Sequence, residues 1–418
     1  MKITAVAVGT RGDTAPFIEL GRELIARGHD FRLAAFEDFH SLADTAGIPY
    51  IHLDGSAEYL TQVLVTEYVR PADFIPGCMK LYHSAPRAVD QMTEAIRGSD
   101  LVLYGMLAGF VRSACELYGI PAVRVFFSPF DATNQYSLYT NAENRWYVGL
   151  MALDQEPVMN YLTIRLHNSW RETHGLRRWR MTDDYRRQNG KWVPTLYPVS
   201  KAMMPPDPKW RPHIHVTGYW FHPEQDADSF TPSEKLRSFL SSGGSPVFVC
   251  LGSMVSEQMH ELQRRMLSAL NALDVRAIVQ LGLLSDDEKK KAGNNIFFAE
   301  NVPYAWLFRH VRAVVHHGGC TTNGLGLYCA RPTLVIPMAL DQYFYGRRVH
   351  DIGAGPEPLY IRKNIPTAGQ LERSLKDLLS GRYDQGARTA AEIIREENGC
   401  GTAADILLDM QADIDGRC

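Results

Sequence analysis

This chain of 418 residues lacks the features that mark secreted, membrane-spanning and nucleic-acid-binding proteins. Its seven cysteines are odd in number and scattered, and no Cys-x-x-Cys pair is present, so neither a disulfide framework nor a zinc site is indicated. No apolar run approaches the roughly 18 residues of a membrane-spanning helix, and the chain opens on a strand pattern instead of a signal peptide. A net charge of −3 gives no reason to expect nucleic acid. We therefore expect a cytoplasmic protein with no membrane span, whose membrane contact, if any, is peripheral.

Two further absences narrow the class of ligand. In neither half is the first strand followed by Gly-x-Gly-x-x-Gly with an acidic residue about twenty positions later, which disfavours a NAD-dependent oxidoreductase. No Asp-x-Asp pair lies near the glycine-containing segments 9–13 and 316–322, so we expect no metal ion there, and no cofactor is expected.

The composition is that of a globular protein with more than one core. Hydrophobic residues make up 45% and charged residues 22%, and 418 residues exceed what one core normally supports. Short apolar runs alternate with helical stretches in both halves, as in parallel sheets covered on both faces. We predict strands at 3–8, 31–35, 101–104, 122–127, 247–251, 277–281, 296–299, 313–316 and 333–336, and helices at 112–118, 257–273 and 342–351.

This pattern predicts an α/β fold of two doubly wound domains. A segment rich in Pro and Asp, 219–233, is interpreted as the linker between an N-terminal domain, 1–218, and a C-terminal domain, 234–395. Residues 396–418 are expected to form a C-terminal helix that packs back on the N-terminal domain. Ligands of such sheets bind beyond the carboxyl ends of the strands, so we expect the site in a cleft between the domains.

One candidate site lies in the second half, at His316–Thr322 (HHGGCTT). A short apolar strand, 312–315, precedes it, and a helix is predicted at 321–329. Glycines at a strand-to-helix turn let the backbone approach a ligand, and the helix directs unpaired N–H groups and its positive dipole end at an anion. The pattern indicates a diphosphate-binding turn; the alternative is that the two histidines merely end a strand.

A second strand–turn–helix unit begins the chain. The apolar strand at 3–8 is followed by a turn, Gly9–Asp13, and Pro16 is a favoured residue for opening a helix. The helix predicted at 17–27 has an apolar face and ends at Gly28.

Together these motifs resemble those of the family 1 glycosyltransferases, whose fold is GT-B with two Rossmann-like domains. The order His-Gly-Gly-x-x-Thr, then Pro332, Pro337 and Asp341-Gln342, is similar to the donor-binding motif of the family, and Gly9–Pro16 is similar to its amino-terminal motif. The likeness is greatest to the bacterial and fungal branch that glycosylates sterols, macrolides, glycopeptides and lipids. One departure is Thr321, where many relatives have Gly.

The resemblance implies a role for each part of the donor site. His317 and Thr322 bind the diphosphate with backbone N–H groups near Gly319, and Asp341 and Gln342 hold the sugar hydroxyls. The Val302 backbone reads the pyrimidine edge, with a Trp packed nearby that is as often a core residue. The implied donor-binding residues are Ser253, Val302, Trp306, His317, Gly318, Gly319, Thr321, Thr322, Asp341 and Gln342.

The donor base stays open. Plant relatives have a Glu that binds the donor ribose, but this chain has Leu325 at that position. The absence of the Glu fits a TDP-sugar. The sterol-type branch also lacks that Glu and uses UDP-glucose. Both a UDP- and a TDP-sugar are therefore carried forward as co-substrate.

Asp13 is the candidate general base, because several bacterial relatives carry Asp where plant relatives carry the His that deprotonates the acceptor. Inverting transfer needs a base on the acceptor oxygen and charge stabilisation on the leaving diphosphate. A carboxylate is a weak base at neutral pH unless its environment raises its pKa. The alternative for Asp13 is a helix cap or a partner of Arg11. Thr10, Arg11 and Gly12 complete the expected N-terminal loop.

Aromatic-rich segments of the first half are the expected acceptor contacts. These residues are expected to line an apolar cleft, with ordinary helix cores as the alternative. They are Phe127, Tyr136, Tyr139, Trp146 and Met151. A basic cluster is interpreted as solvated surface, with an anionic acceptor or anionic membrane surface as its functional alternative. It comprises Arg177, Arg178, Arg180, Arg186 and Arg187.

The sequence thus predicts an inverting, metal-independent glycosyltransferase that moves a hexose to a hydroxyl of a hydrophobic small molecule such as a natural product, phenol, sterol or lipid. Transfer to nitrogen or carbon stays open. Two other functions also stay open. One is an epimerase or hydrolase with the same donor-binding residues, and the other is a non-catalytic donor-binding protein.

Overall fold

The computed structural model describes residues 1–63, 74–133, 135–136, 164, 166–180, 183, 186–228, 230–252, 256–300, 302–338, 341–361 and 364–415. The chain divides into two compact units: unit 1 (Met1–Phe221 with Asn398–Cys418) and unit 2 (His222–Glu397). Each unit has its own parallel sheet, so the predicted α/β fold with two parallel-sheet domains is confirmed. Among the described helices, none is long and apolar enough to cross a membrane.

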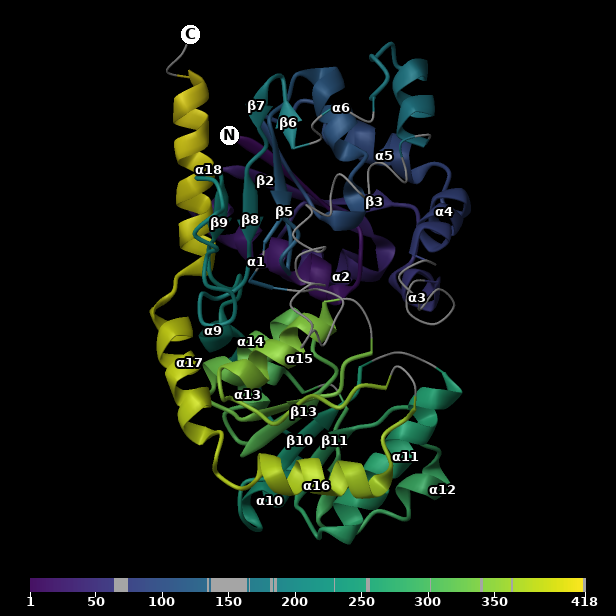
Figure 1. Cartoon of the computed structure of the whole chain (residues 1–418), viewed down its shortest axis with the longest axis vertical. Helices are drawn as coiled ribbons and strands as arrows, with labels where there is room; N and C mark the ends of the chain where they lie inside the picture. The colour runs from purple at the N-terminus through teal and green to yellow at the C-terminus, as the bar shows by residue number, and fades with distance from the viewer. Residues whose placement is uncertain are drawn as a thin grey trace. The chain divides into compact units, whose positions relative to one another are not determined.

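Unit 1 is built on seven parallel strands in the order β3-β2-β1-β4-β5-β8-β9, beside a small antiparallel hairpin, β6-β7 (Figure 1). The strands are β1 (Lys2–Ala7), β2 (Asp30–Phe36), β3 (Tyr50–Leu53), β4 (Leu101–Tyr104), β5 (Ala122–Val125), β6 (Arg187–Gln188), β7 (Lys191–Trp192), β8 (Thr195–Tyr197) and β9 (Ile214–Val216). The sequence prediction lacks β3, β8 and β9 as well as the two-residue strands β6 and β7. β3 and β9 are only partly buried and each contains a His, so neither shows the continuous apolar run of the predicted strands.

The labelled helices of unit 1 come from both stretches of chain that form this unit. They are α1 (Arg11–Ala26), α2 (His40–Thr45), α3 (Ala57–Thr61), α4 (Phe74–Ser84), α5 (Ala88–Ala95), α6 (Val111–Tyr118) and α18 (Gly399–Asp415), with short 3₁₀ turns at Glu37–Phe39 and Met106–Ala108. Helix α18 packs along α1, and Arg27 after α1 forms an ion pair with Asp405 of α18.

The first helix begins earlier than predicted. Helix α1 starts at Arg11, whereas the sequence pattern predicts a start at Pro16. Thr10 is the N-cap residue, and its backbone N–H and hydroxyl both donate to the Asp13 carboxylate, at 2.7 and 3.0 Å. This bonding lets the helix form from Arg11, with Pro16 in its second turn at the loss of one backbone hydrogen bond. Asp13 therefore lies in a helix and not in a loop.

A buried ion pair braces the chain after β5. Arg124 has no exposed surface, and its guanidinium contacts Asp131 at 2.6 Å. The hydroxyl of Tyr197 donates to the same carboxylate at 2.7 Å and accepts the backbone N–H groups of Phe130 and Asp131. Because the carboxylate is paired and hydrogen-bonded, the turn that follows β5 is tied to β8.

Unit 2 is built on five parallel strands in the order β12-β11-β10-β13-β14. They are β10 (Val247–Cys250), β11 (Ala277–Gln280), β12 (Ile296–Phe298), β13 (Ala313–His316) and β14 (Thr333–Val335). The helices are α9 (Pro223–Asp228), α10 (Glu234–Ser241), α11 (Glu257–Ala272), α12 (Asp286–Lys289), α13 (Tyr304–Leu307), α14 (Cys320–Tyr328), α15 (Gln342–Asp351), α16 (Ala368–Leu378) and α17 (Asp384–Glu396). The segment predicted as a linker, 219–233, thus contains α9 and lies mostly in unit 2.

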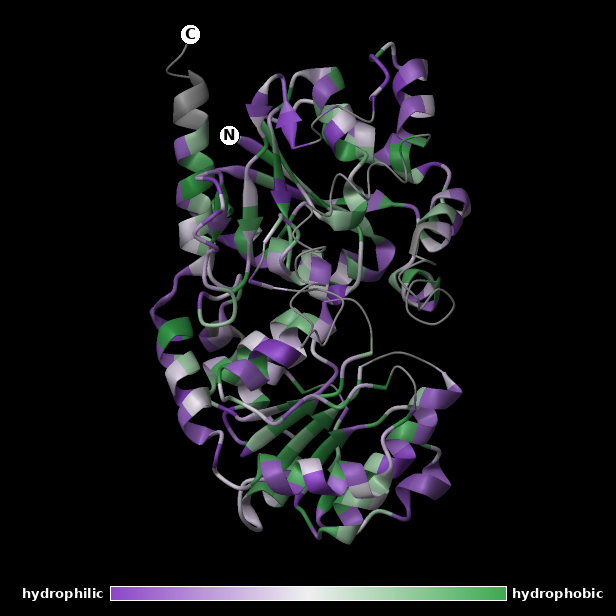
Figure 2. Cartoon of the chain, viewed as in Figure 1, coloured by the Kyte–Doolittle hydropathy of each residue, from purple (hydrophilic) through white to green (hydrophobic). Residues whose placement is uncertain are grey.

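The strands of unit 2 are buried on both faces. Val247 and Val249 share a core cluster with α11 and α16, whereas Phe248 between them packs against Phe308 and Tyr304. Successive side chains of a strand point to opposite faces, so a continuous apolar run serves two cores. Figure 2 shows the strands coloured hydrophobic and many hydrophilic residues on α11 and α12.

We expect Asp131→Ala to destabilise unit 1 by about 3 to 5 kcal/mol, because it leaves Arg124 charged and buried without its carboxylate. Urea unfolding followed by tryptophan fluorescence measures the change. The matched control is Glu94→Ala, which removes the exposed pair with Arg97 and should leave the transition nearly unchanged. Equal effects of the two substitutions would contradict the bracing role.

Candidate functional site

In each sheet the strand order reverses at one place, between β1 and β4 in unit 1 and between β10 and β13 in unit 2. Open α/β sheets bind ligands beyond the carboxyl ends of the strands at such a reversal. Both sequence motifs lie there. Thr10–Asp13 follows β1, and His317 follows β13.

The turn after β13 has a shape that only glycine fits. Gly318 has a φ of 102°, and a Cβ there would lie 2.9 Å from the Val335 side chain and 3.0 Å from the Gln342 carbonyl oxygen. Gly319 is the N-cap of α14, which begins at Cys320, one residue before the predicted start. The close approach of Gly318 to Gln342 brings together two motifs that are separated along the sequence.

His317 is held between two glycine backbones. A Cβ on Gly252 would lie 3.3 Å from His317 Nδ1, and a Cβ on Gly319 would lie 2.9 Å from Nε2. The loops meet because Cys250 of β10 pairs in register with His316 of β13. Within the described part of the chain, the buried Nδ1 atom has no hydrogen-bond partner. Burial lowers the pKa of His317 to about 4, so the ring is neutral near pH 7 and carries one N–H for a ligand.

The preceding histidine has a structural task. His316 is fully buried, and its Nδ1 accepts the backbone N–H of Gly318 at 2.9 Å. That bond assigns the ring proton to Nε2. Burial, with a smaller contribution from His317, lowers the pKa of His316 to about 3. His316 therefore fixes the turn as a neutral ring.

The first turn of α14 follows the glycine turn directly, and His317, Gly318, Gly319 and this helix end are together called the cradle. Thr321 and Thr322 lie in that turn and are partly exposed. The first N–H groups of a helix have no intrahelical partner, and the helix dipole places partial positive charge beside them. A diphosphate fits these donors, with the Thr322 hydroxyl and the His317 ring beside them.

Asp341 and Gln342 lie at the start of α15, and both are partly exposed. Gln342 Oε1 accepts the backbone N–H of Met338 at 2.9 Å, and the Tyr343 hydroxyl donates to the Met338 carbonyl at 2.9 Å. These bonds fix the chain before α15, so that the Asp-Gln pair stands next to the glycine turn.

A polar network that sequence reasoning missed orders the segment around Val302. The Tyr304 hydroxyl donates to Gln280 Oε1 at 2.8 Å, and Gln280 Nε2 donates to the Glu300 carbonyl at 2.6 Å. The same carbonyl accepts the N–H of Val302 at 2.8 Å. The signal in the sequence is a polar residue, Gln280, at the carboxyl end of an apolar strand. Trp306 instead stacks on His310 and meets Phe230 edge-on, so the described contacts of its ring are packing contacts.

Asp13 caps the first helix, and it also has a raised pKa. As the third residue of α1 it caps the helix through Thr10, and Gly9 makes room for it, since a Cβ there would lie 2.4 Å from Asp13 Oδ2. Burial raises the pKa of Asp13, although the hydrogen bonds from Thr10 oppose the rise. Among the described contacts no ion pair joins Asp13 to Arg11, which is exposed. Gly12 lies in the same first turn.

Two of the expected acceptor contacts are described. Phe127 is partly exposed and meets Phe17 edge-on, with centroids 6.2 Å apart. Tyr136 is 8% exposed, and its hydroxyl donates to the Pro205 carbonyl. Four other expected site residues, Tyr139, Trp146, Met151 and Ser253, lie outside the described residues.

We expect His317→Ala to weaken the binding of UDP or TDP roughly ten- to hundredfold, the value of one hydrogen bond to a charged group. Isothermal titration calorimetry gives the affinity. The control is His260→Ala, since that ring bonds to Glu288 between α11 and α12. Unchanged affinity in the His317 variant would remove this ring from the phosphate site.

Comparisons with known proteins point to glycosyltransferases. The Glycosyltransferase family 28 N-terminal domain matches residues 3–137, and the Erythromycin biosynthesis protein CIII-like, C-terminal domain matches residues 264–405. The Sterol 3-beta-glucosyltransferase of Yarrowia lipolytica is 30% identical over 96% of this chain, which spans 28% of that protein.

Solved structures share the fold over the full length. CalG4, the calicheamicin glycosyltransferase, matches with a TM-score of 0.71 at 17% identity, over 99% of both chains. The glycosyltransferase VinC in complex with dTDP matches with a TM-score of 0.69 at 16% identity, over 98% of this chain and 99% of that one. The fold implied by the sequence resemblance is thereby confirmed: this chain has the GT-B fold that these solved glycosyltransferases share.

Proposed function

We propose that this protein transfers a hexose from a UDP- or TDP-sugar to a hydroxyl of a hydrophobic small molecule, with inversion and without a metal ion. The observation that carries the proposal is the cradle of unit 2. His317 is neutral, its buried Nδ1 has no hydrogen-bond partner among the described residues, and its ring lies against Gly252 and Gly319 beside the N-terminus of α14. Neutral N–H donors and a helix dipole suit a diphosphate leaving group.

On the donor side, the bond between the anomeric carbon and the β-phosphate oxygen breaks, and negative charge grows on the departing diphosphate. The N–H groups of the first turn of α14, the Thr322 hydroxyl and the His317 ring stabilise that charge. Because these groups are fixed by the Gly318 turn and by His316, they need little reorganisation as the charge develops. Asp341 and Gln342 hold the sugar hydroxyls, and the segment at Val302 receives the base.

On the acceptor side, Asp13 removes the proton from the acceptor hydroxyl as its oxygen attacks the anomeric carbon. The raised pKa of this buried carboxyl makes it a stronger base than an exposed Asp. The Thr10 hydrogen bonds occupy Oδ2, which leaves Oδ1 for the proton and holds the carboxyl in one orientation.

The relatives support a class of substrates. Sterol 3-beta-glucosyltransferases match over nearly the whole chain, which favours glucose and a flat polycyclic alcohol as acceptor. VinC and the spinosyn rhamnosyltransferase SpnG bind TDP in their solved structures, which keeps a TDP-sugar as the second donor candidate. We infer a sterol or a comparably hydrophobic natural product as acceptor, in line with the partly exposed Phe127.

Asp13→Asn should lower kcat roughly 10²- to 10⁴-fold while the affinity for the nucleotide sugar stays unchanged. The amide keeps the oxygen that caps α1 but cannot accept the proton. Initial rates with UDP-glucose and a sterol acceptor, together with calorimetry of the donor, separate the two effects. The control is Asp44→Asn, an exposed substitution in α2. Full turnover in Asp13→Asn would exclude Asp13 as the base.

The pH dependence of kcat/KM should reflect the pKa of the Asp13 carboxyl. Protonated Asp13 cannot act as a base, so activity falls as the pH drops through its pKa. Because burial raises that pKa, the half-activity point lies above the ordinary value of 3.8. A pH–rate profile of the wild-type protein tests this expectation. An acid limb at or below 3.8, or the same limb in Asp13→Asn, would contradict it.

A further inference from the structure

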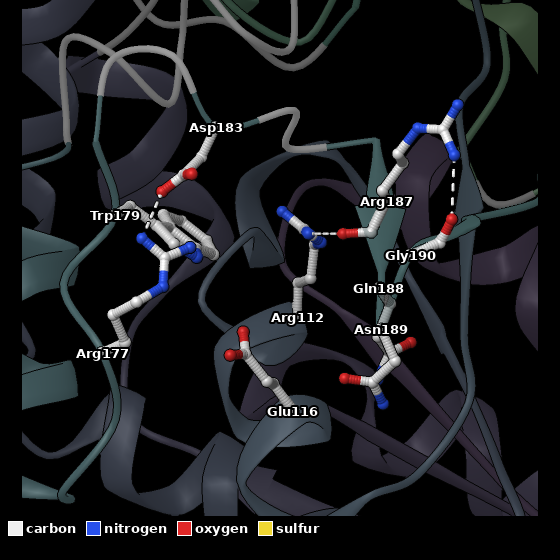
Figure 3. A pocket seen from close by; sticks show the side chains of 9 residues that line it. All are labelled: Arg112, Glu116, Arg177, Trp179, Asp183, Arg187, Gln188, Asn189 and Gly190. Atoms are coloured by element: carbon white, nitrogen blue, oxygen red, sulfur yellow. Dashed lines mark hydrogen bonds and ion pairs between the residues drawn. The ribbon is translucent and has the colours of Figure 1, made fainter.

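Unit 1 contains a cavity of about 300 Å³ that no expected donor-binding residue lines, although Arg177 and Arg187 of the basic cluster do (Figure 3). Its walls come from α6, from the segment around Trp179 and from the β6-β7 hairpin. The charged and aromatic lining consists of Arg112, Glu116, Arg177, Trp179, Asp183 and Arg187.

Both carboxylates of this cavity already have partners. The two oxygens of Glu116 accept the two terminal nitrogens of Arg171, at 2.8 and 2.9 Å. Asp183 accepts Arg177 Nη1 at 2.9 Å and the backbone N–H of Arg180 at 2.7 Å. Neither carboxylate has a recorded ion pair with Arg112.

Arg112 is the unusual residue of the cavity. It is only 5% exposed, and one terminal nitrogen donates to the Arg187 carbonyl. In the described part of the chain, its Nε and Nη1 atoms have no hydrogen-bond partner. The guanidinium lies 5.1 Å from the centre of the Trp179 ring, and Figure 3 shows it reaching between Trp179 and Arg187.

Such a group has few ways to lower its free energy. A guanidinium stays protonated in proteins, so burial cannot neutralise it as it neutralises a histidine. The neighbouring His167 shows the contrast: burial, helped by the charges of Arg112 and Arg171, lowers its pKa to about 3. A buried charge is costly unless a counter-charge and hydrogen bonds compensate it. An anion in the cavity would supply both.

We propose that this cavity binds a phosphate group, with Arg112 as its buried anchor and the exposed Arg187 at its edge. Around the cavity, the guanidinium groups of Arg112, Arg171 and Arg177 accompany two carboxylates, which leaves an excess of one positive charge. The Arg187 side chain at the edge donates to the Gly190 carbonyl and lies over the Trp192 ring. A phosphate group is negatively charged near pH 7 and would compensate the excess. Arginine N–H groups and phosphate oxygens form strong charge-assisted hydrogen bonds.

The phosphate belongs to a free small anion or to a lipid headgroup, and the cavity recognises the same chemistry in both. The proposal does not depend on glycosyl transfer, because its residues all lie in unit 1 and none belongs to the donor cradle.

The first test measures the melting temperature with sodium phosphate against sodium chloride at equal ionic strength. We expect a saturable rise for the wild-type protein, because a ligand that binds only the folded state stabilises it. Arg112→Met should lose the rise. Arg178→Met should keep it, since Arg178 pairs with Glu172 outside the cavity. His317→Ala should also keep it, which separates this site from the donor cradle.

The second test measures cosedimentation with phosphatidylcholine vesicles that contain or lack phosphatidic acid. Binding that needs phosphatidic acid and is lost in Arg112→Met identifies a lipid headgroup. A melting response without vesicle binding identifies a free phosphate. If Arg112→Met does not fold, Arg187→Met replaces it and should weaken the response severalfold. The proposal fails if the wild-type protein responds in neither test, or if the Arg112 and Arg187 variants respond as the wild type does.

Discussion

The hydrogen-bonded ladder between β10 and β13 is the interaction on which the candidate donor site depends. Its register pairs Cys250 with His316, so the two strands end level and their following loops meet. Gly252 can then touch the ring of His317, and the turn after β13 can begin α14 directly at the cradle. A slip of one residue would turn the side chain of His316 to the opposite face of the sheet and displace the turn that carries His317.

The histidines and arginines of this chain illustrate two responses to burial. His316 and His317 become neutral, and a neutral ring serves as a rigid donor or acceptor in a cradle for an anion. Arg124 and Arg112 keep their charge. Arg124 has a carboxylate partner within the core, whereas Arg112, within the described residues, donates to one carbonyl and lies over an aromatic ring without a carboxylate partner. Arg124 therefore braces the fold, whereas Arg112 marks a candidate ligand site.

Much of the fold and the donor cradle could be predicted from local sequence. The apolar runs of β10, β11 and β13 and the glycines after His317 are short-range signals, since a buried strand and a tight turn each restrict the residues that fit them. The start of α1 was misplaced because Pro16 resembles a first-turn residue, while the Thr10–Asp13 bonding that starts the helix is a matter of geometry. The network of Gln280 with Tyr304 and the setting of Arg112 join distant segments, and no local pattern encodes such contacts.

The placement of α18 has a consequence for how the molecule is made. Unit 1 consists of two stretches of chain, with all of unit 2 inserted between them. During synthesis, domains fold in the order in which they leave the ribosome, from the N-terminus. Here unit 2 is complete while unit 1 still lacks the helix that packs along α1. The face of α1 that contacts α18 therefore stays without its partner until α18 emerges, and a chaperone could bind it during that interval.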